Sequence, residues 1–192
     1  RACGTAAGSV PAARWTLSSV VNVSALSAAQ AACVQHGGFV AHAERFDSRL
    51  FGVSRAEASS MDPQHRLLLE DGYKALHSGG LDRRALEGSL TGVFLGIAAA
   101  DFASLLGTTP AGSSVYAATG ASHSIACGRV SYALGLHGPC ASYDTACSAA
   151  LTAYHASLSA LQLEECRDGL AAGINLMLTP NNATAFAIAG LT

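Results

Sequence analysis

Hydrophobic and polar positions along this chain follow two alternating patterns. Nearly continuous apolar or small residues predict strands at 91–97, 139–143 and 169–177. Apolar residues at helical spacing predict helices at 63–78, 123–134 and 148–163. Strands and helices that follow one another in turn indicate an α/β fold, in which helices cover a sheet.

Polar residues and a proline mark where several helices begin. Asp62 precedes Pro63, and an N-cap aspartate before a proline at the first helical position is typical of a helix start. Ser54 and Asp82 predict caps for two shorter helices, the first over residues 55–60. These caps predict helix starts independently of the apolar pattern.

The helix predicted at 148–163 needs a buried side. Placing its larger side chains inward gives an apolar side made of Leu151, Tyr154, His155, Leu158 and Leu161.

Other stretches of the chain have a weaker hydrophobic pattern. We expect loops at 11–15 and 107–114 and short helices at 25–34 and 101–106.

Composition narrows the function classes. Charged residues make up 12% of the chain and hydrophobic residues 50%, whereas charged residues average about 25% of a soluble domain. Either much of the exterior is buried against another domain or subunit, or the chain is simply rich in Ala and Gly. The net charge is −2, without a basic stripe, which disfavours nucleic-acid binding. Continuous apolar runs are too short for a membrane span.

Six cysteines are spread along the sequence. They are Cys3, Cys33, Cys127, Cys140, Cys147 and Cys166. Their spacing matches neither a zinc site nor a disulfide framework, so we expect free thiols in an intracellular reducing compartment such as the cytoplasm or a plastid. The seven histidines also lack metal-ligand spacing, and no metal or cofactor is expected.

Cys147 is the candidate nucleophile. It lies between small residues, after a predicted strand and at the start of a predicted helix. Unpaired N–H groups at a helix start favour a thiolate, and small neighbours leave room for a substrate carbonyl. We expect Asp144 and Thr145 to shape the preceding turn, and the Cys147 N–H to be one possible oxyanion donor.

Several segments together resemble the β-ketoacyl synthase family, in particular the ketosynthase domains of polyketide and fatty-acid synthases. The matching segments are 45–54, 61–70, 118–120 with 123–132, 138–139 leading into 144–148, and 172–178. They come in the family's order and span residues 37–192. We therefore expect a partial β-ketoacyl synthase N-terminal domain over residues 1–192, in which residues 1–36 are a poorly matched leader.

The resemblance implies a thiolase-like fold, a layered αβαβα arrangement of two similar halves, of which this chain holds mostly the first. Cys147 would take an acyl group from the phosphopantetheine thioester of an acyl carrier protein. A malonyl-type extender would then decarboxylate and attack that thioester, giving a β-ketoacyl product. Family members are usually homodimers, so a dimer or larger assembly is expected.

Parts of the family pattern are missing from these 192 residues. The family has two downstream catalytic histidines and a glycine-rich oxyanion segment, and its first strand also has no match here. His155 cannot replace them, because eight helical residues place it roughly 12 Å from Cys147 along the axis. We expect His155 to be structural, His123 to pack or hydrogen-bond, and His65 to be structural or exposed.

Three functions remain open. The chain is part of a working ketosynthase, a ketosynthase-derived subunit that serves assembly rather than catalysis, or a related synthase that uses coenzyme A thioesters. Condensation by these residues alone is not expected. A cysteine protease or α/β-hydrolase is disfavoured, because Thr145 and Ala149 occupy the glycine positions of the nucleophile elbow.

Overall fold

A computed structural model describes residues 7–16 and 21–191. The contacts of the chain divide it into two compact units. One comprises residues 1–42 and 176–192, and the other residues 43–175. The second unit carries the candidate nucleophile Cys147 and all three histidines considered beside it.

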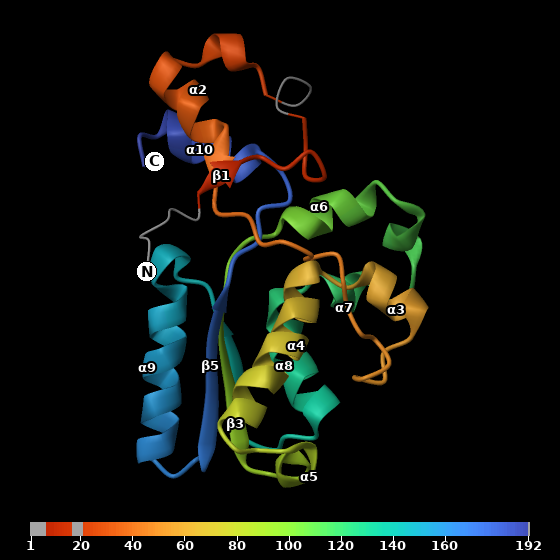
Figure 1. Cartoon of the computed structure of the whole chain (residues 1–192). Coiled ribbons are helices and arrows are strands. Elements are labelled where there is room, and N and C mark those ends of the chain that lie inside the picture. Colours follow the sequence, from red (N-terminus) through yellow and green to blue (C-terminus); the bar gives the residue numbers. More distant parts are fainter. Residues whose placement is uncertain (1–6, 17–20, 192) are drawn as a thin grey trace. The chain divides into compact units, whose positions relative to one another are not determined.

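The larger unit is built on a parallel three-stranded sheet in the order β4–β3–β5. Its strands are β3 (Thr91–Ile97), β4 (Cys140–Tyr143) and β5 (Asp168–Ile174). Figure 1 labels the strands β3 and β5. β3 is buried at every position, as expected for a central strand with both faces covered. All three predicted strands are confirmed, with small differences at the ends of β4 and β5.

Two helices, α4 (Pro63–Ser78) and α8 (His123–Leu134), cover one face of the sheet (Figure 1). Large side chains fill this interface: Leu69 from α4 and Val130 from α8 share a buried cluster with Val93 and Leu95 of β3. α4 and α8 have the predicted bounds, because helical spacing and buried face agree in both.

Within the larger unit, α9 (Ala149–Gln162) covers the opposite face (Figure 1). Its buried residues are small: Ala149, Ala153, Ser157 and Ala160. The predicted inward side is therefore wrong for Leu151, Tyr154, His155 and Leu158, which are exposed, and holds only for Leu161.

The reason for this reversal is the sheet beneath the helix. A Cβ on Gly96 would lie 2.5 Å from the backbone of Ala149, and a Cβ on Gly173 would lie 2.5 Å from the Cβ of Ala150. α9 thus lies against glycines at a distance that only small residues allow. Apart from Leu161, its large side chains are directed away from the sheet.

Shorter elements connect these layers. They are α3 (Arg55–Ser60), α5 (Arg83–Leu86), α6 (Asp101–Gly107), η2 (Pro110–Ser113) and α7 (Ala117–Gly120). The predicted caps are confirmed, because the side chains of Ser54, Asp62 and Asp82 each accept a backbone N–H of the helix that follows. The expected loop at 107–114 contains η2.

The smaller unit pairs β1 (Gly8–Ser9) with β2 (His36–Gly37) in antiparallel fashion. It also holds η1 (Val23–Ala25), α2 (Ala28–Val34) and α10 (Asn181–Ile188), and α2 packs against α10. The helix predicted at 25–34 begins later, because Ser27 and Gln30 form a capping box at its start.

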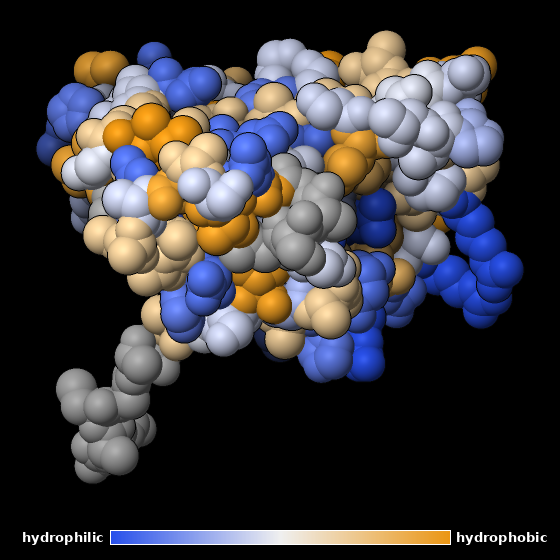
Figure 2. All heavy atoms as spheres, turned by 90° about the horizontal axis from the view of Figure 1, so that it is seen from above, coloured by the Kyte–Doolittle hydropathy of each residue, from blue (hydrophilic) through white to orange (hydrophobic). Residues whose placement is uncertain are grey.

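Hydrophobic side chains reach the surface in several places. In Figure 2 orange hydrophobic residues lie among blue and pale ones over the face shown. Val115 and Tyr132 are 86% and 91% exposed, which fits the charge-poor composition. Across the described residues, no helix combines the length and apolar character needed to span a bilayer.

Candidate active site

Cys147 lies at the carboxyl end of the parallel sheet. β4 ends at Tyr143, and the chain turns through η3 (Ala146–Ser148) into α9. Ligands of open α/β sheets bind outside the carboxyl ends of the strands. The Cys147 side chain is exposed there, at the turn between a strand and a helix that the sequence predicts.

The turn before Cys147 is held in an unusual backbone conformation. Ala146 has a φ of 52°, in the left-handed region that alanine rarely adopts. Its N–H donates to Asp144 Oδ1 at 3.2 Å, and Ser148 Oγ donates to the Thr145 carbonyl at 2.8 Å. Asp144 and Thr145 therefore shape the turn, as predicted. Non-glycine residues in this region concentrate at functional sites.

Sequence reasoning missed this strained turn, because it looked for glycines on both sides of a nucleophile. The left-handed residue here is Ala146, directly before Cys147. The only available signal was the run of small residues around the cysteine. That run permits such a turn without predicting it.

Gly96 positions the start of α9 above the sheet. It pairs in register with Tyr143 of β4 on one side and with Gly173 of β5 on the other. Because Gly96 has no side chain, the backbone of Ala149 lies directly against it. The residue two places after Cys147 is thus fixed by backbone contact with the central strand.

The three histidines considered beside Cys147 are placed differently in the fold. His155 is on the exposed side of α9, two helical turns beyond the thiol. His123 begins α8, and its Nε2 lies 2.9 Å from the Ala99 carbonyl, which confirms a hydrogen-bonding role. His65 is 1% exposed and has no hydrogen-bond partner at either ring nitrogen. It is structural, and burial lowers its pKa to about 3.

A buried polar network joins the start of α4 to the end of β3. Gln64 Nε2 donates to the Ala99 carbonyl at 2.9 Å, the same oxygen that His123 contacts. Asp62 accepts the Gln64 N–H at 2.8 Å, and burial raises the pKa of this carboxyl above its usual value. The network explains why the segment 61–70 is polar at its start: these side chains connect α4, α8 and the loop after β3.

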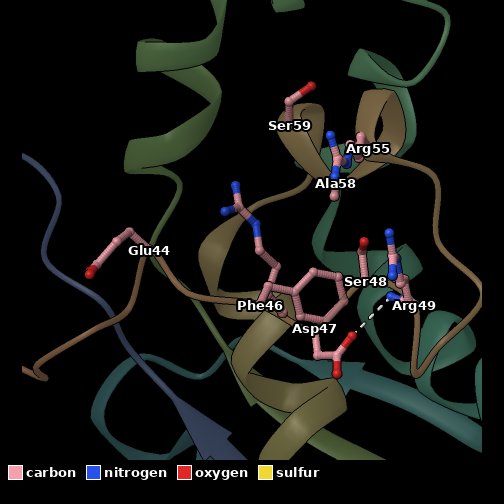
Figure 3. Close-up of a pocket in the computed structure, with 9 residues that line it drawn as sticks. Glu44, Phe46, Asp47, Ser48, Arg49, Arg55, Ala58 and Ser59 are labelled. Atoms are coloured by element: carbon pink, nitrogen blue, oxygen red, sulfur yellow. Dashed lines mark hydrogen bonds between the residues drawn. The ribbon is translucent and has the colours of Figure 1, made fainter.

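An open pocket of about 400 Å³ lies elsewhere, between residues 44–49 and the helices α3 and α4 (Figure 3). Three arginines line it, Arg49, Arg55 and Arg66, together with Glu44 and Asp47. Asp47 Oδ1 accepts the Arg49 N–H at 3.1 Å, which shapes the loop at its floor. No lining residue belongs to the Cys147 turn, so this pocket is separate from the candidate nucleophile.

Within the described part of the chain, no group of three or more His, Cys, Asp or Glu side chains is arranged to hold a metal ion. Cys127, Cys140, Cys147 and Cys166 are free thiols, and Cys3 lies outside the described residues.

Comparison with known proteins decides the family. Residues 2–192 match the family described as "Beta-ketoacyl synthase, N-terminal domain". The chain belongs to the β-ketoacyl synthase family. Polyketide synthase GfsB of Streptomyces halstedii is 46% identical over 156 residues, which are 81% of this chain and 3% of that protein.

A second polyketide synthase relative covers more of this ketosynthase chain. A phenolphthiocerol/phthiocerol polyketide synthase subunit of Mycobacterium tuberculosis is 38% identical over 186 residues, 97% of this chain and 12% of that protein. The ketosynthase chain therefore spans only 3% and 12% of these two relatives.

Solved ketosynthases have the same fold. The oxazolomycin ketosynthase domain OzmH KS7 of Streptomyces albus JA3453 is 31% identical with a TM-score of 0.82, over 96% of this chain and 32% of that one. The ketosynthase from module 6 of the bacillaene synthase of Bacillus subtilis 168 is 31% identical with a TM-score of 0.75, over 96% and 29%. These matches confirm the predicted thiolase-like α/β fold, and they cover only 32% and 29% of the two solved chains.

Proposed function

We propose that this chain supplies the acyl-accepting part of a polyketide synthase ketosynthase domain, with Cys147 as the nucleophile. The observation that carries the proposal is the exposed Cys147 thiol on a strained turn between β4 and α9. Family membership makes β-ketoacyl condensation the general chemistry. The position of this thiol supports its assignment to the acyl-transfer step.

In the loading step the Cys147 thiolate attacks the carbonyl carbon of an acyl thioester on a carrier protein. A new carbon–sulfur bond forms to Cys147 Sγ, and the bond to the phosphopantetheine sulfur breaks. That sulfur leaves as a thiol after taking a proton. The Cys147 N–H is a candidate donor to the oxygen that carries negative charge in the tetrahedral intermediate. The phosphopantetheine arm is a substrate, and the step needs no resident cofactor.

In the condensation step a malonyl-type extender loses carbon dioxide, and its carbanion attacks the acyl thioester on Cys147. Cys147 leaves as a thiolate, and the product is a β-ketoacyl thioester. Stabilising the extender carbonyl requires donors besides Cys147, and His155, on the outer side of α9, is placed too far away to be one. The full reaction therefore needs groups from outside these 192 residues, in the same polypeptide or in a partner.

The partners follow from the same chemistry. A carrier protein must present the acyl group at the carboxyl end of β4. A homodimer or larger assembly accounts for the exposed apolar side of α9, where Leu151 is 69% exposed. A reducing intracellular compartment keeps Cys147 reduced and so able to accept an acyl group.

The test is acyl loading measured by mass spectrometry. The polypeptide that contains this chain is incubated with a carrier protein that bears an acyl group, and peptide mass spectrometry locates the residue that receives it. We expect it on Cys147. Cys147→Ala should lose loading completely, while Cys140→Ser, a matched change at a second exposed cysteine, should retain it. If the Cys147→Ala protein loads as much acyl group as the parent protein, Cys147 is not the acyl acceptor.

The same assay separates the other two functions. An assembly subunit without catalysis would bind its partners but leave Cys147 unacylated by any donor. Its supporting observation is the row of exposed apolar residues on α9. A synthase that uses coenzyme A thioesters would load faster from acyl-coenzyme A than from the carrier protein.

A further inference from the structure

Two cysteines outside the Cys147 turn are directed to the same face of the sheet. Cys140 begins β4 and pairs in register with Val93 of β3. Residues in register on neighbouring strands point to the same face. Val93 belongs to the buried cluster that contains Cys127 and Val130 of α8. The Cys140 side chain therefore points toward α8, the helix that carries Cys127.

The two thiols are close enough to affect one another. Burial raises the pKa of the Cys140 thiol, and interaction with the Cys127 thiol raises it further. Cys127 Sγ donates weakly to the Ser124 carbonyl at 3.6 Å, which fixes its position on α8. α8 packs directly along β4, so the helix and the strand hold the pair together.

The other described cysteines are placed differently. Cys166 is buried in the cluster under α9, on the opposite face of the sheet. Cys33 belongs to the smaller unit, and Cys147 lies in the turn beyond the end of β4. The structure thus groups Cys127 with Cys140 and leaves the remaining described thiols outside the pair.

We propose that Cys127 and Cys140 are an oxidative modification site, at which a reversible disulfide joins α8 to β4. With hydrogen peroxide as the oxidant, the Cys140 thiolate attacks one peroxide oxygen, and the other oxygen leaves as water after taking a proton. Cys127 Sγ then attacks the resulting sulfenic acid, and the hydroxyl leaves as a second water. Two thiols and one peroxide give one disulfide and two waters.

Exposure and ionisation set the order and pace of these steps. Cys140 is exposed and Cys127 only 4% exposed, so peroxide reaches Cys140 first. Because the raised pKa leaves little thiolate at neutral pH, the reaction is slow at pH 7 and accelerates as the pH rises. The bond closes a short loop between a helix and the strand that leads to Cys147, and it should raise Tm by about 5–10 °C.

The test uses the polypeptide that contains this chain, treated with hydrogen peroxide at pH 7 and pH 9, alkylated and digested. Trypsin leaves Cys127 and Cys140 in different peptides, because Arg129 lies between them. Chymotrypsin then separates Cys140 from Cys147 at Tyr143. We expect a Cys127 peptide joined to a Cys140 peptide, lighter than their sum by two hydrogens. It should form several-fold faster at pH 9 and disappear with dithiothreitol.

Two substitutions serve as controls. Cys140→Ser at the exposed strand position should abolish the linked peptide and the Tm increase. Cys166→Ala, which alters a buried cysteine on the opposite face, should preserve both. Recovery of Cys127 and Cys140 as separate peptides, or of Cys140 joined to Cys147 or to a second copy of itself, would overturn the proposal. None of these outcomes depends on whether Cys147 accepts an acyl group.

Discussion

The two faces of the sheet are packed by opposite means. Under α4 and α8, large side chains such as Leu69 and Val130 interlock with those of β3. Under α9, glycines of the sheet meet alanines of the helix, and the backbones nearly touch. The first face gains stability from buried apolar area, whereas the second fixes the position of a helix start.

This difference matters because Cys147 belongs to the second face. A helix held by long side chains can shift as those side chains change rotamer, but a helix lying against Gly96 has little room to move. Precise placement of a nucleophile can remove a large part of the activation free energy of the reaction. The glycine-lined face therefore suits the site, and the apolar face suits the stability of the unit.

The largest effect should come from the apolar face. Leu69 is fully buried, so Leu69→Ala should lower the free energy of unfolding by about 3–4 kcal/mol through lost burial and a residual cavity. Leu163→Ala, the same change at a 69% exposed position, should cost less than about 0.5 kcal/mol. Urea denaturation of both variants measures the difference. Equal losses of unfolding free energy in the two variants would mean that side-chain burial on this face does not stabilise the unit.

The glycine-lined face should respond to one added methyl group. Gly96→Ala places a Cβ against the Ala149 backbone and should cost roughly 2–3 kcal/mol, because α9 must move away from the sheet. It should also slow acyl loading of Cys147 more than Leu69→Ala does, when both are measured at temperatures where each remains folded.

The matched control for this prediction is Gly128→Ala. A Cβ on Gly128 in α8 meets no atom within 4 Å, so this change should be neutral or stabilise by up to about 1 kcal/mol. If the two alanine variants unfold alike, close packing under α9 has no special role.

An acid-dependent effect should appear on the apolar side, through His65. Burial lowers the folded-state pKa of His65 to about 3, whereas the unfolded chain binds that proton near 6.5. Above pH 6.5 neither state is protonated there, so His65 adds no pH dependence. As the pH falls below 6.5 the unfolded state gains the proton first, and by pH 4.5 stability should drop by about 2–3 kcal/mol.

His65→Leu should lack that loss. The measurement is the free energy of unfolding of both proteins at pH 7 and pH 4.5, and the variant should gain about 2–3 kcal/mol relative to the parent between them. Asp62, whose pKa is raised by burial, contributes with the opposite sign but is present in both proteins. If the difference in unfolding free energy between the variant and the parent is the same at pH 7 and pH 4.5, the pKa of His65 in the folded protein is near its usual value.

Sequence patterns predicted the apolar face well, because there the side chains that carry hydrophobicity are the ones that are buried. β3 and α8 have the predicted bounds for that reason. The pattern failed on α9, where close backbone approach selects alanine over leucine. Hydrophobic spacing does not report that approach, and Gly96 and Gly173, far apart along the chain, reveal it only once β3 and β5 are paired.

The candidate site divides in the same way. Small residues around Cys147 were visible in the sequence, and its place after a strand was predicted correctly. The left-handed conformation of Ala146 was not predicted, because local side-chain hydrogen bonds hold an alanine where alanine is rare. The burial of His65 was not predicted either, because it results from tertiary packing. The sequence motifs were enough to predict the family, whereas the geometry around Cys147 is seen only in the folded structure.

The smallest effect is expected on the outer side of α9. Leu151 is 69% exposed, so Leu151→Ser should change the free energy of unfolding of the 192-residue chain by no more than about 0.5 kcal/mol. The same substitution in a longer polypeptide or assembly that contains this chain tests what lies over the helix. A loss of about 2 kcal/mol or more there would show that another surface buries Leu151. The outer side of α9 would then be an apolar interface in its own right, and the helix that begins beside Cys147 would be fixed by close backbone contact on one side and by large side chains on the other.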